Sequence, residues 1–203
     1  KTNIVKLAKA ILTETGDDFF ANYIEVATPE EVEEMDDQQI AAYALRAIIN
    51  GSVDEMYIPE EATTLREFGW YALTQLLATS VPSLNFASLD KNSTDSLIIM
   101  GIDYAIYSIE SELDMGLEYA MTMDEVDTQL KKAAQYGIDN YGGLFSGIEF
   151  TAADDGWSTI EKILFRILDR SWLPAASNGS FQTFLIDNLI ENILDLDFEA
   201  LVG

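Results

Sequence analysis

The sequence predicts an all-α protein, and three observations support this fold class. Apolar residues recur at the three- and four-residue spacing of a helix face through most of the chain. Signals that start and stop helices separate these stretches, whereas the alternating pattern of strands is nearly absent. Hydrophobic residues make up 48% of the 203 residues, so the chain can bury a core. We therefore expect an irregular bundle of about eight or nine helices.

The amino-terminal part of the chain contains the first predicted helices. Apolar residues form helical stripes over 4–12 and again over 19–24. The sequence Thr-Pro-Glu-Glu at 28–31 combines an N-cap, a first-turn proline and a capping-box glutamate, so a third helix should begin there. A further stripe covers 40–48.

The middle of the chain contains the most apolar segment. The sequence Pro-Glu-Glu at 59–61 predicts the start of a helix that runs to about residue 79. Ser93 or Asn92 then caps a helix over about 94–113 that is apolar on most sides. A helix of this kind belongs inside a bundle, so we expect it at the centre.

The carboxyl-terminal part begins with a second capping box, formed by Thr122 and Glu125. Glycines at 137–150 predict an irregular connection there, and a minor boundary within an otherwise single domain, 1–203. Helices should follow over 158–171 and 180–196. The apolar residues expected to pack from these two helices are Ile160, Ile163, Leu164, Ile167, Leu168, Phe181, Leu185, Leu189 and Ile193.

The charge of the chain restricts its partners. Acidic residues number 36 against 11 basic ones, which gives a formal net charge of −25. Such a field repels nucleic acid and anionic membranes, and no basic stripe for direct nucleic-acid binding is present. Basic protein surfaces and cations are the favoured partners.

Enzyme chemistry and cofactor binding have little support in the sequence. The chain has no histidine and no cysteine, which excludes histidine-based catalysis, thiolate nucleophiles and zinc–thiolate sites. Phosphate-binding glycine motifs are absent, and the loops beginning at Asn50 and Asp90 fail the calcium-loop pattern. We therefore predict no catalytic residue and no cofactor. Metal binding by surface carboxylates stays open.

The sequence also gives an expectation about membranes and processing. The longest apolar stretch runs from Leu97 to Ile109, is interrupted by Asp103 and is too short to span a bilayer. We expect a soluble protein without a visible signal peptide. Lys1 is not an initiator residue, so trimming of the amino terminus is expected. The compartment is not predicted.

Two charged features near the chain ends are candidate interaction sites. A basic tip at the amino terminus contrasts with an acidic ridge on the last predicted helix, where like charges four residues apart repel one another. Anions near a helix carboxyl terminus are also disfavoured by its dipole, which suggests a compensating cation or basic partner. The basic tip consists of Lys1, Lys6 and Lys9, and the ridge consists of Asp187, Glu191, Asp195 and Glu199.

These features favour a non-enzymatic structural or protein–protein interaction subunit of a larger assembly, such as a processed virion component. A protein partner or self-association is expected, because the basic tip of one copy can pair with the acidic ridge of the next. One alternative is an acidic nucleic-acid mimic that inhibits a DNA-binding protein. Another is a hydrolase or lyase that uses carboxylates alone.

Overall fold

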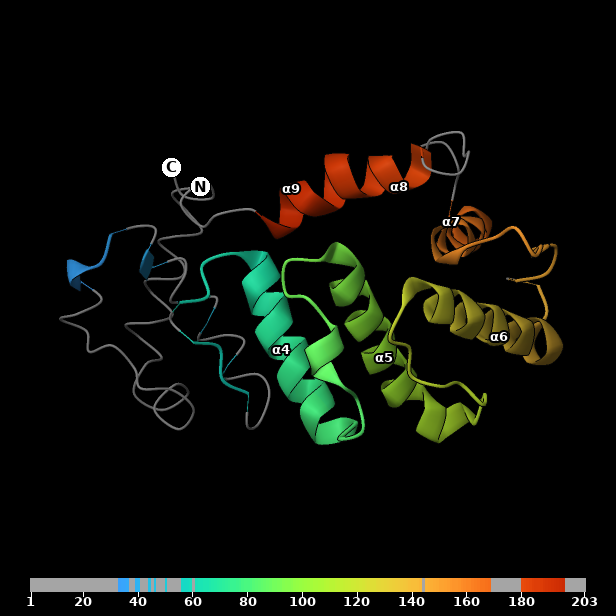
Figure 1. Cartoon of the computed structure of the whole chain (residues 1–203), viewed down its shortest axis with the longest axis horizontal. Coiled ribbons are helices and arrows are strands. Elements are labelled where there is room, and N and C mark those ends of the chain that lie inside the picture. Colours follow the sequence, from blue (N-terminus) through green and yellow to red (C-terminus); the bar gives the residue numbers. More distant parts are fainter. Residues whose placement is uncertain are drawn as a thin grey trace. The chain divides into compact units, whose positions relative to one another are not determined.

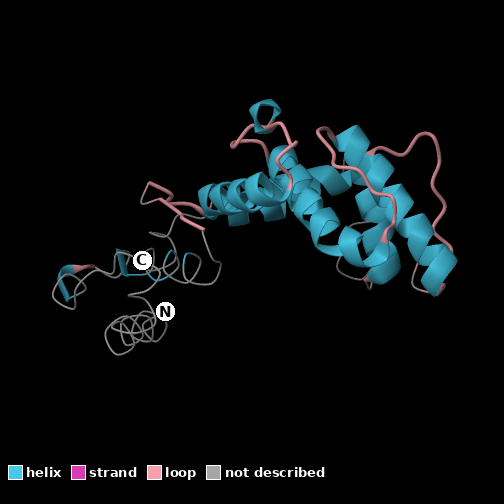
Figure 2. Ribbon diagram, turned by 90° about the horizontal axis from the view of Figure 1, so that it is seen from below, coloured by secondary structure: helices cyan, strands magenta, loops and turns pink. Residues whose placement is uncertain are grey.

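A computed structural model of the chain describes residues 33–36, 39–40, 44, 46, 50, 56–59, 61–143, 145–168 and 180–195. These residues form helices and loops without a strand, which confirms the all-α class for this part of the chain (Figure 1, Figure 2). Five helices lie in it when the continuous stretch 180–194, labelled α8, η4 and α9, is counted as one, and the expected count of eight or nine is not supported. The helices predicted before residue 33 lie outside the described residues.

The chain divides into two compact units. The first comprises Lys1–Gln75 and Ile193–Gly203, and the second comprises Leu76–Asn192. One boundary falls within helix α4, Leu65–Ser80, and the other within the last helix rather than at 137–150. The single domain expected from the sequence stays a prediction.

Helix α4 begins at Leu65 and not at Pro59, which corrects the predicted start. Thr64 is its N-cap, because the Thr64 hydroxyl accepts the backbone N–H of Glu67 at 3.3 Å. In return, the Glu67 carboxylate accepts the backbone N–H groups of Thr63 and Thr64 at 2.8 and 3.1 Å. This reciprocal capping box satisfies donors that the first turn leaves free, so the helix starts here.

The extended segment before α4 is held by two amide side chains. Buried Asn50 accepts the backbone N–H of Ile58 at 2.7 Å and donates to its carbonyl oxygen at 3.4 Å. Gln75 on α4 likewise accepts the backbone N–H of Tyr57 at 2.7 Å and donates to its carbonyl oxygen at 2.6 Å. These side chains supply the hydrogen bonds that a neighbouring strand would otherwise provide.

Two helices of the second unit begin where the sequence predicts. Helix α5, Thr94–Leu113, is capped by Ser93, whose hydroxyl accepts the backbone N–H of Ser96 at 3.4 Å. Helix α6, Met123–Tyr141, is capped by Thr122, whose hydroxyl accepts the N–H of Glu125 at 3.3 Å. Both predicted N-caps are confirmed. Among the described helices, none is long and apolar enough to cross a bilayer.

The predicted break at Gly137 is wrong, because α6 continues to Tyr141. A Cβ atom on Gly137 would lie 2.5 Å from the ring of Phe145. The glycine therefore serves close packing rather than helix termination. The irregular connection begins at Gly142, where φ is +59°.

One hydrophobic cluster of the second unit forms where α7, Gly156–Ile167, meets α8, Ser180–Leu185, and another joins Ile99 of α5 to Ala120 and to Val126 of α6. Trp157, Phe181 and Leu185 are buried in the first cluster, and the rings of Phe165 and Phe181 meet edge to face with centroids 6.2 Å apart. Helix α7 packs against both α6 and α8, and α5 packs against α6.

The last helix is not regular along its length. After α8 it makes a π-helical turn, η4, over Ile186–Ile190 and ends as α9, Glu191–Leu194. The wide turn breaks the 3.6-residue period, which explains why Leu189 and Ile193 are exposed rather than packed as expected. Ile167 and Leu168 are exposed as well, because α7 ends at Ile167. These four assignments to the core are corrected.

Candidate functional site

An unusual surface lies on the carboxyl-terminal half of α5 and on the segment 114–122 that follows it. Tyr104, Tyr107 and Tyr119 are exposed by 37%, 44% and 38%. Glu112 and Glu118 are exposed beside them in the chain. We call these five exposed residues, which belong to α5 and to the segment that follows it, the acidic tyrosine face. Large exposed side chains of this kind are typical of interaction surfaces.

The sequence around this face is strongly one-sided in charge. Between Lys91 and Lys131 there is no lysine or arginine. The acids in this interval are Asp95, Asp103, Glu110, Glu112, Asp114, Glu118, Asp124, Glu125 and Asp127. Within the described structure, an ion pair offsets Glu118, whose carboxylate lies 3.3 Å from Lys132 Nζ, and another offsets Asp127. The face therefore lies in a negative local field.

Two acids on the inner side of α5 hold the segment 114–122 in place. Asp103 is fully buried, and its Oδ1 accepts the backbone N–H of Ala120 at 2.9 Å. One carboxylate oxygen of Glu110 accepts the N–H groups of Gly116 and Leu117 at 2.8 and 3.3 Å. These bonds fold the segment back along α5 and fix the position of Tyr119.

Burial makes Asp103 electrostatically unusual. Removal from water raises the pKa of Asp103 from 3.8 to about 6, against the opposing effect of the Ala120 N–H, and the charge of Glu125 adds to the rise. The second oxygen, Oδ2, is buried and has no hydrogen-bond partner among the described residues. Burial, followed by the charge of Asp103, also raises the pKa of Tyr119, so its phenol stays a neutral donor.

The groups on this face can bind a cation. Tyrosine rings attract cations over their faces, and the neighbouring carboxylates accept hydrogen bonds from ammonium and guanidinium groups. The two inner carboxylates already bind backbone N–H groups of the protein itself. No cluster of three or more potential metal ligands occurs among the described residues.

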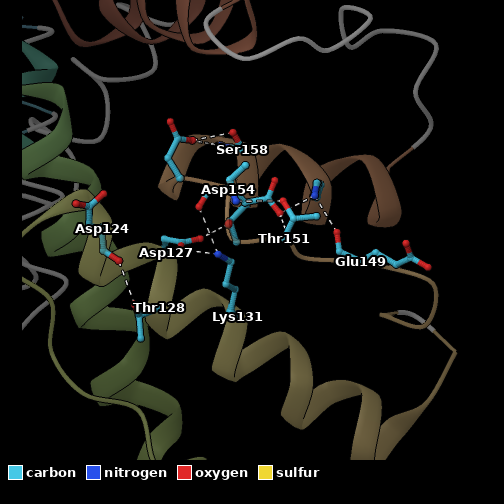
Figure 3. A network of polar contacts seen from close by, with 12 residues as sticks. Asp124, Asp127, Thr128, Lys131, Glu149, Thr151, Asp154 and Ser158 are labelled. Carbon is cyan, nitrogen blue, oxygen red and sulfur yellow. Dashed lines mark hydrogen bonds and ion pairs between the residues drawn. The ribbon is translucent and has the colours of Figure 1, made fainter.

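A second group of polar contacts joins α6, α7 and the connection between them (Figure 3). Lys131 of α6 points toward that connection, with Nζ 2.7 Å from Asp127 Oδ2 and 3.4 Å from the carbonyl oxygen of Asp154. On α7, Lys162 Nζ lies 2.7 Å from Asp154 Oδ2 and donates to the carbonyl oxygen of Glu149 at 2.8 Å. Asp127 also accepts a hydrogen bond from the hydroxyl group of Thr159 on α7.

The electrostatics of this network indicate a structural role. Burial opposes ionisation of Asp154, but the hydrogen bonds from Lys162 and from the N–H of Thr151 outweigh it and lower the pKa of Asp154. Hydrogen bonds from Ser158 lower the pKa of Asp155, which caps α7. Stable carboxylates paired with nearby donors anchor the connection to both helices.

The structure places three of the residues predicted for interaction. Asp187 is exposed in the π-helical turn, Glu191 accepts a hydrogen bond from the Thr94 hydroxyl, and Asp195 Oδ1 lies 2.8 Å from Arg66 Nε. Arg66 thus provides one compensating cation from within the chain. The predicted residues outside the described part are Lys1, Lys6, Lys9 and Glu199. The interaction role of all seven stays a prediction.

Sequence reasoning did not single out the acidic tyrosine face. Tyr104 and Tyr107 lie in a strongly apolar helix that the sequence predicts at the centre of the bundle, so the local pattern does not indicate that their rings are exposed. The base-free interval from 92 to 130 was the available signal. It marks a local excess of negative charge that the overall net charge conceals.

Comparison with known proteins gives no match to a family model, a curated protein or a solved structure. Function is therefore inferred from the geometry and charges of the described residues.

Proposed function

We propose that the protein is a non-enzymatic interaction subunit of a larger assembly, and that its acidic tyrosine face binds a basic segment of protein. The observation that carries this proposal is the exposure of Tyr104, Tyr107 and Tyr119 within an interval that has acids but no bases. Tyrosine is enriched at protein interfaces because it combines a large apolar ring with a polar end.

The chemistry of the face matches lysine and arginine side chains. Such a side chain places its charge over a tyrosine ring while its apolar stem covers neighbouring surface. Glu112 and Glu118 supply acceptors, and the negative field accelerates the approach of a basic partner.

The face is also held ready for binding. Asp103 and Glu110 fix the segment 114–122 through three hydrogen bonds to its backbone. Tyr119 therefore loses little conformational freedom when a partner binds. A surface ordered in advance reduces the entropic cost of association.

The basic segment can belong to a different protein or to a second copy of this chain. In the second case, the basic segment consists of Lys1, Lys6 and Lys9, which bind the acidic tyrosine face of the next copy. Copies then join head to tail, as in a virion or another assembly. A DNA-binding protein is a further basic partner, and the protein then acts as a nucleic-acid mimic.

Light scattering at low and high salt tests self-association, because screening weakens contacts between exposed charges. The self-association form of the proposal predicts a mass above that of the monomer at low salt and a monomer at high salt. Deletion of residues 1–9 should remove this difference. If the chain is a monomer at both salt concentrations and binds no arginine-rich peptide, the proposal is wrong.

The mimic form has its own test. A DNA-binding partner recovered on the immobilised protein should be released by duplex DNA, since both compete for one basic surface. A partner that binds this protein and DNA at the same time contradicts the mimic form. The proposal of a basic partner that does not use its DNA-binding surface then remains.

A further inference from the structure

An open hollow of about 330 Å³ lies beside α7, and its lining shares no residue with the acidic tyrosine face. Its volume is at the lower end of the range for small-molecule sites, about 300 to 1,000 Å³. The residues that line it are Gly147, Ile148, Glu149, Lys162, Phe165 and Arg166.

The hollow has a positive balance within a protein of strongly negative charge. Lys162 and Arg166 contribute two cations from successive turns of α7, and Glu149 contributes one carboxylate. The formal balance of the lining residues is positive, against −25 for the whole chain. Asp154, outside the lining, pairs with Lys162 at 2.7 Å, so Arg166 is the main cation that the hollow offers to an anion. A basic concavity in a repelling field is a local site for an anion.

Arg166 is the residue that most needs an explanation. Its Nε donates to the carbonyl oxygen of Ser146 at 2.7 Å, and its Nη2 donates to that of Gly143. These acceptors are neutral, and no ion pair with Arg166 occurs within the described residues. The two bonds fix the guanidinium group while its charge and its remaining N–H donors stay available at the hollow.

The other walls of the hollow are apolar or backbone. Ile148 and the ring of Phe165 flank the two cations. Gly147 has φ +84° and open space where a side chain would lie, so a ligand can approach the backbone closely. The connection that carries Ile148 and Glu149 is anchored by Lys162 and by the Asp154 network (Figure 3).

We propose that this hollow binds a small molecule that carries an oxyanion, a carboxylate or a phosphate, on an apolar group. Arg166 binds the oxyanion, and Lys162 adds positive charge nearby while it stays paired with Asp154. Phe165 and Ile148 contact the apolar part. Glu149 disfavours multiply charged anions. The competing explanation is that Arg166 only stabilises the carboxyl-terminal end of α7 and its loop, since a cation there complements the helix dipole.

Titrations monitored by protein NMR at low ionic strength distinguish these explanations. The probes are phenyl phosphate, benzoate, inorganic phosphate and acetate. The proposal predicts saturable shifts at 147–149 and 162–166, with phenyl phosphate or benzoate binding more tightly than its counterpart without a ring. Comparison of phenyl phosphate with benzoate shows which oxyanion is preferred.

Matched variants make the test sharper. Arg166→Gln should weaken binding about tenfold, as expected when one charge-assisted hydrogen bond is lost. Glu149→Gln should strengthen it, because it removes the only carboxylate of the lining and leaves the Glu149 carbonyl contact with Lys162 unchanged. Lys132→Gln, which removes a base that is paired with Glu118 and does not line the hollow, should leave binding unchanged.

Two results overturn the proposal. One is the absence of saturable shifts in the wild-type protein. The other is equal affinity in the wild type and in folded Glu149→Gln, which shows that the charge of Glu149 does not affect binding and that the anion binds elsewhere. If Arg166→Gln loses its fold, the Glu149→Gln comparison still decides the question.

Discussion

Asp103 accepts the backbone N–H of Ala120 at 2.9 Å, while its second carboxylate oxygen is buried without a hydrogen-bond partner in the described part of the chain. The carboxylate that holds the segment 114–122 against α5 is therefore a buried charge, and its hydrogen bond to Ala120 compensates poorly for the loss of water. Tyr119, next to Ala120 in the chain, depends on this contact for its position. The proposed interaction surface is thus linked to a group whose pKa is raised by burial.

The first prediction concerns that pH dependence. Because the pKa of Asp103 is raised from 3.8 to about 6 in the folded protein, the ionised carboxylate is destabilising. The penalty grows as pH rises from about 4 to about 6 and is constant above. Asp103→Asn keeps an acceptor for Ala120 without the charge. Its stability relative to the wild type should increase by about 2 to 3 kcal/mol between pH 4 and pH 7.

Denaturant unfolding at several pH values measures this difference. Glu112→Gln removes an exposed carboxylate from the same helix and serves as the control. A stability difference between Asp103→Asn and the wild type that is the same at pH 4 and pH 7 contradicts the assignment.

The second prediction compares two helical glycines. A Cβ on Gly137 meets the Phe145 ring at 2.5 Å, whereas Gly101 on α5 has no atom within 4 Å of that position. Gly101→Ala should stabilise the protein by up to about 1 kcal/mol through helix propensity. Gly137→Ala should instead destabilise it by about 1 to 3 kcal/mol through overpacking. Thermal unfolding of both variants provides the measurement.

Combining Gly137→Ala with Phe145→Ala checks the cause. If the contact with Phe145 produces the loss, the alanine at 137 costs less stability in the Phe145→Ala background than in the wild type. Equal costs in both backgrounds show that another contact is responsible.

The third prediction concerns the start of α4. Burial opposes ionisation of Glu67, but hydrogen bonds from Thr63 and Thr64 outweigh it and lower the pKa of Glu67. Thr64→Ala should cost about 1 kcal/mol of stability because it removes the N-cap hydroxyl. Thr63→Ala, which loses only a 3.3 Å contact with the Glu67 side chain, should cost less. Equal losses contradict Thr64 as the N-cap.

Local signals were sufficient to predict several elements from the sequence. Ser93 and Thr122 cap α5 and α6 because each provides a hydroxyl for a free N–H of the first helical turn. The proline signal at 59 failed, since the capping box at Thr64 and Glu67 provides more hydrogen bonds to the helix start.

Features that depend on distant contacts were not predictable. The helix continues through Gly137 because Phe145 packs there, which no local pattern reveals. The π-helical turn at 186–190 interrupts the helix on which the sequence predicts the acidic ridge. Asp195 of that ridge pairs with Arg66, which is far away in the sequence. Exposure of Tyr107 likewise depends on what packs against α5.

Binding of a labelled arginine-rich peptide, followed by fluorescence anisotropy at low salt, tests the proposed function most directly. The wild type should bind saturably and lose affinity at high salt. Tyr107→Ala should weaken binding about tenfold, as expected for a tyrosine at the centre of an interface. Tyr141→Ala removes a tyrosine that is 68% exposed but outside the face, and it should bind like the wild type. Equal affinity of all three proteins contradicts the acidic tyrosine face as the binding surface.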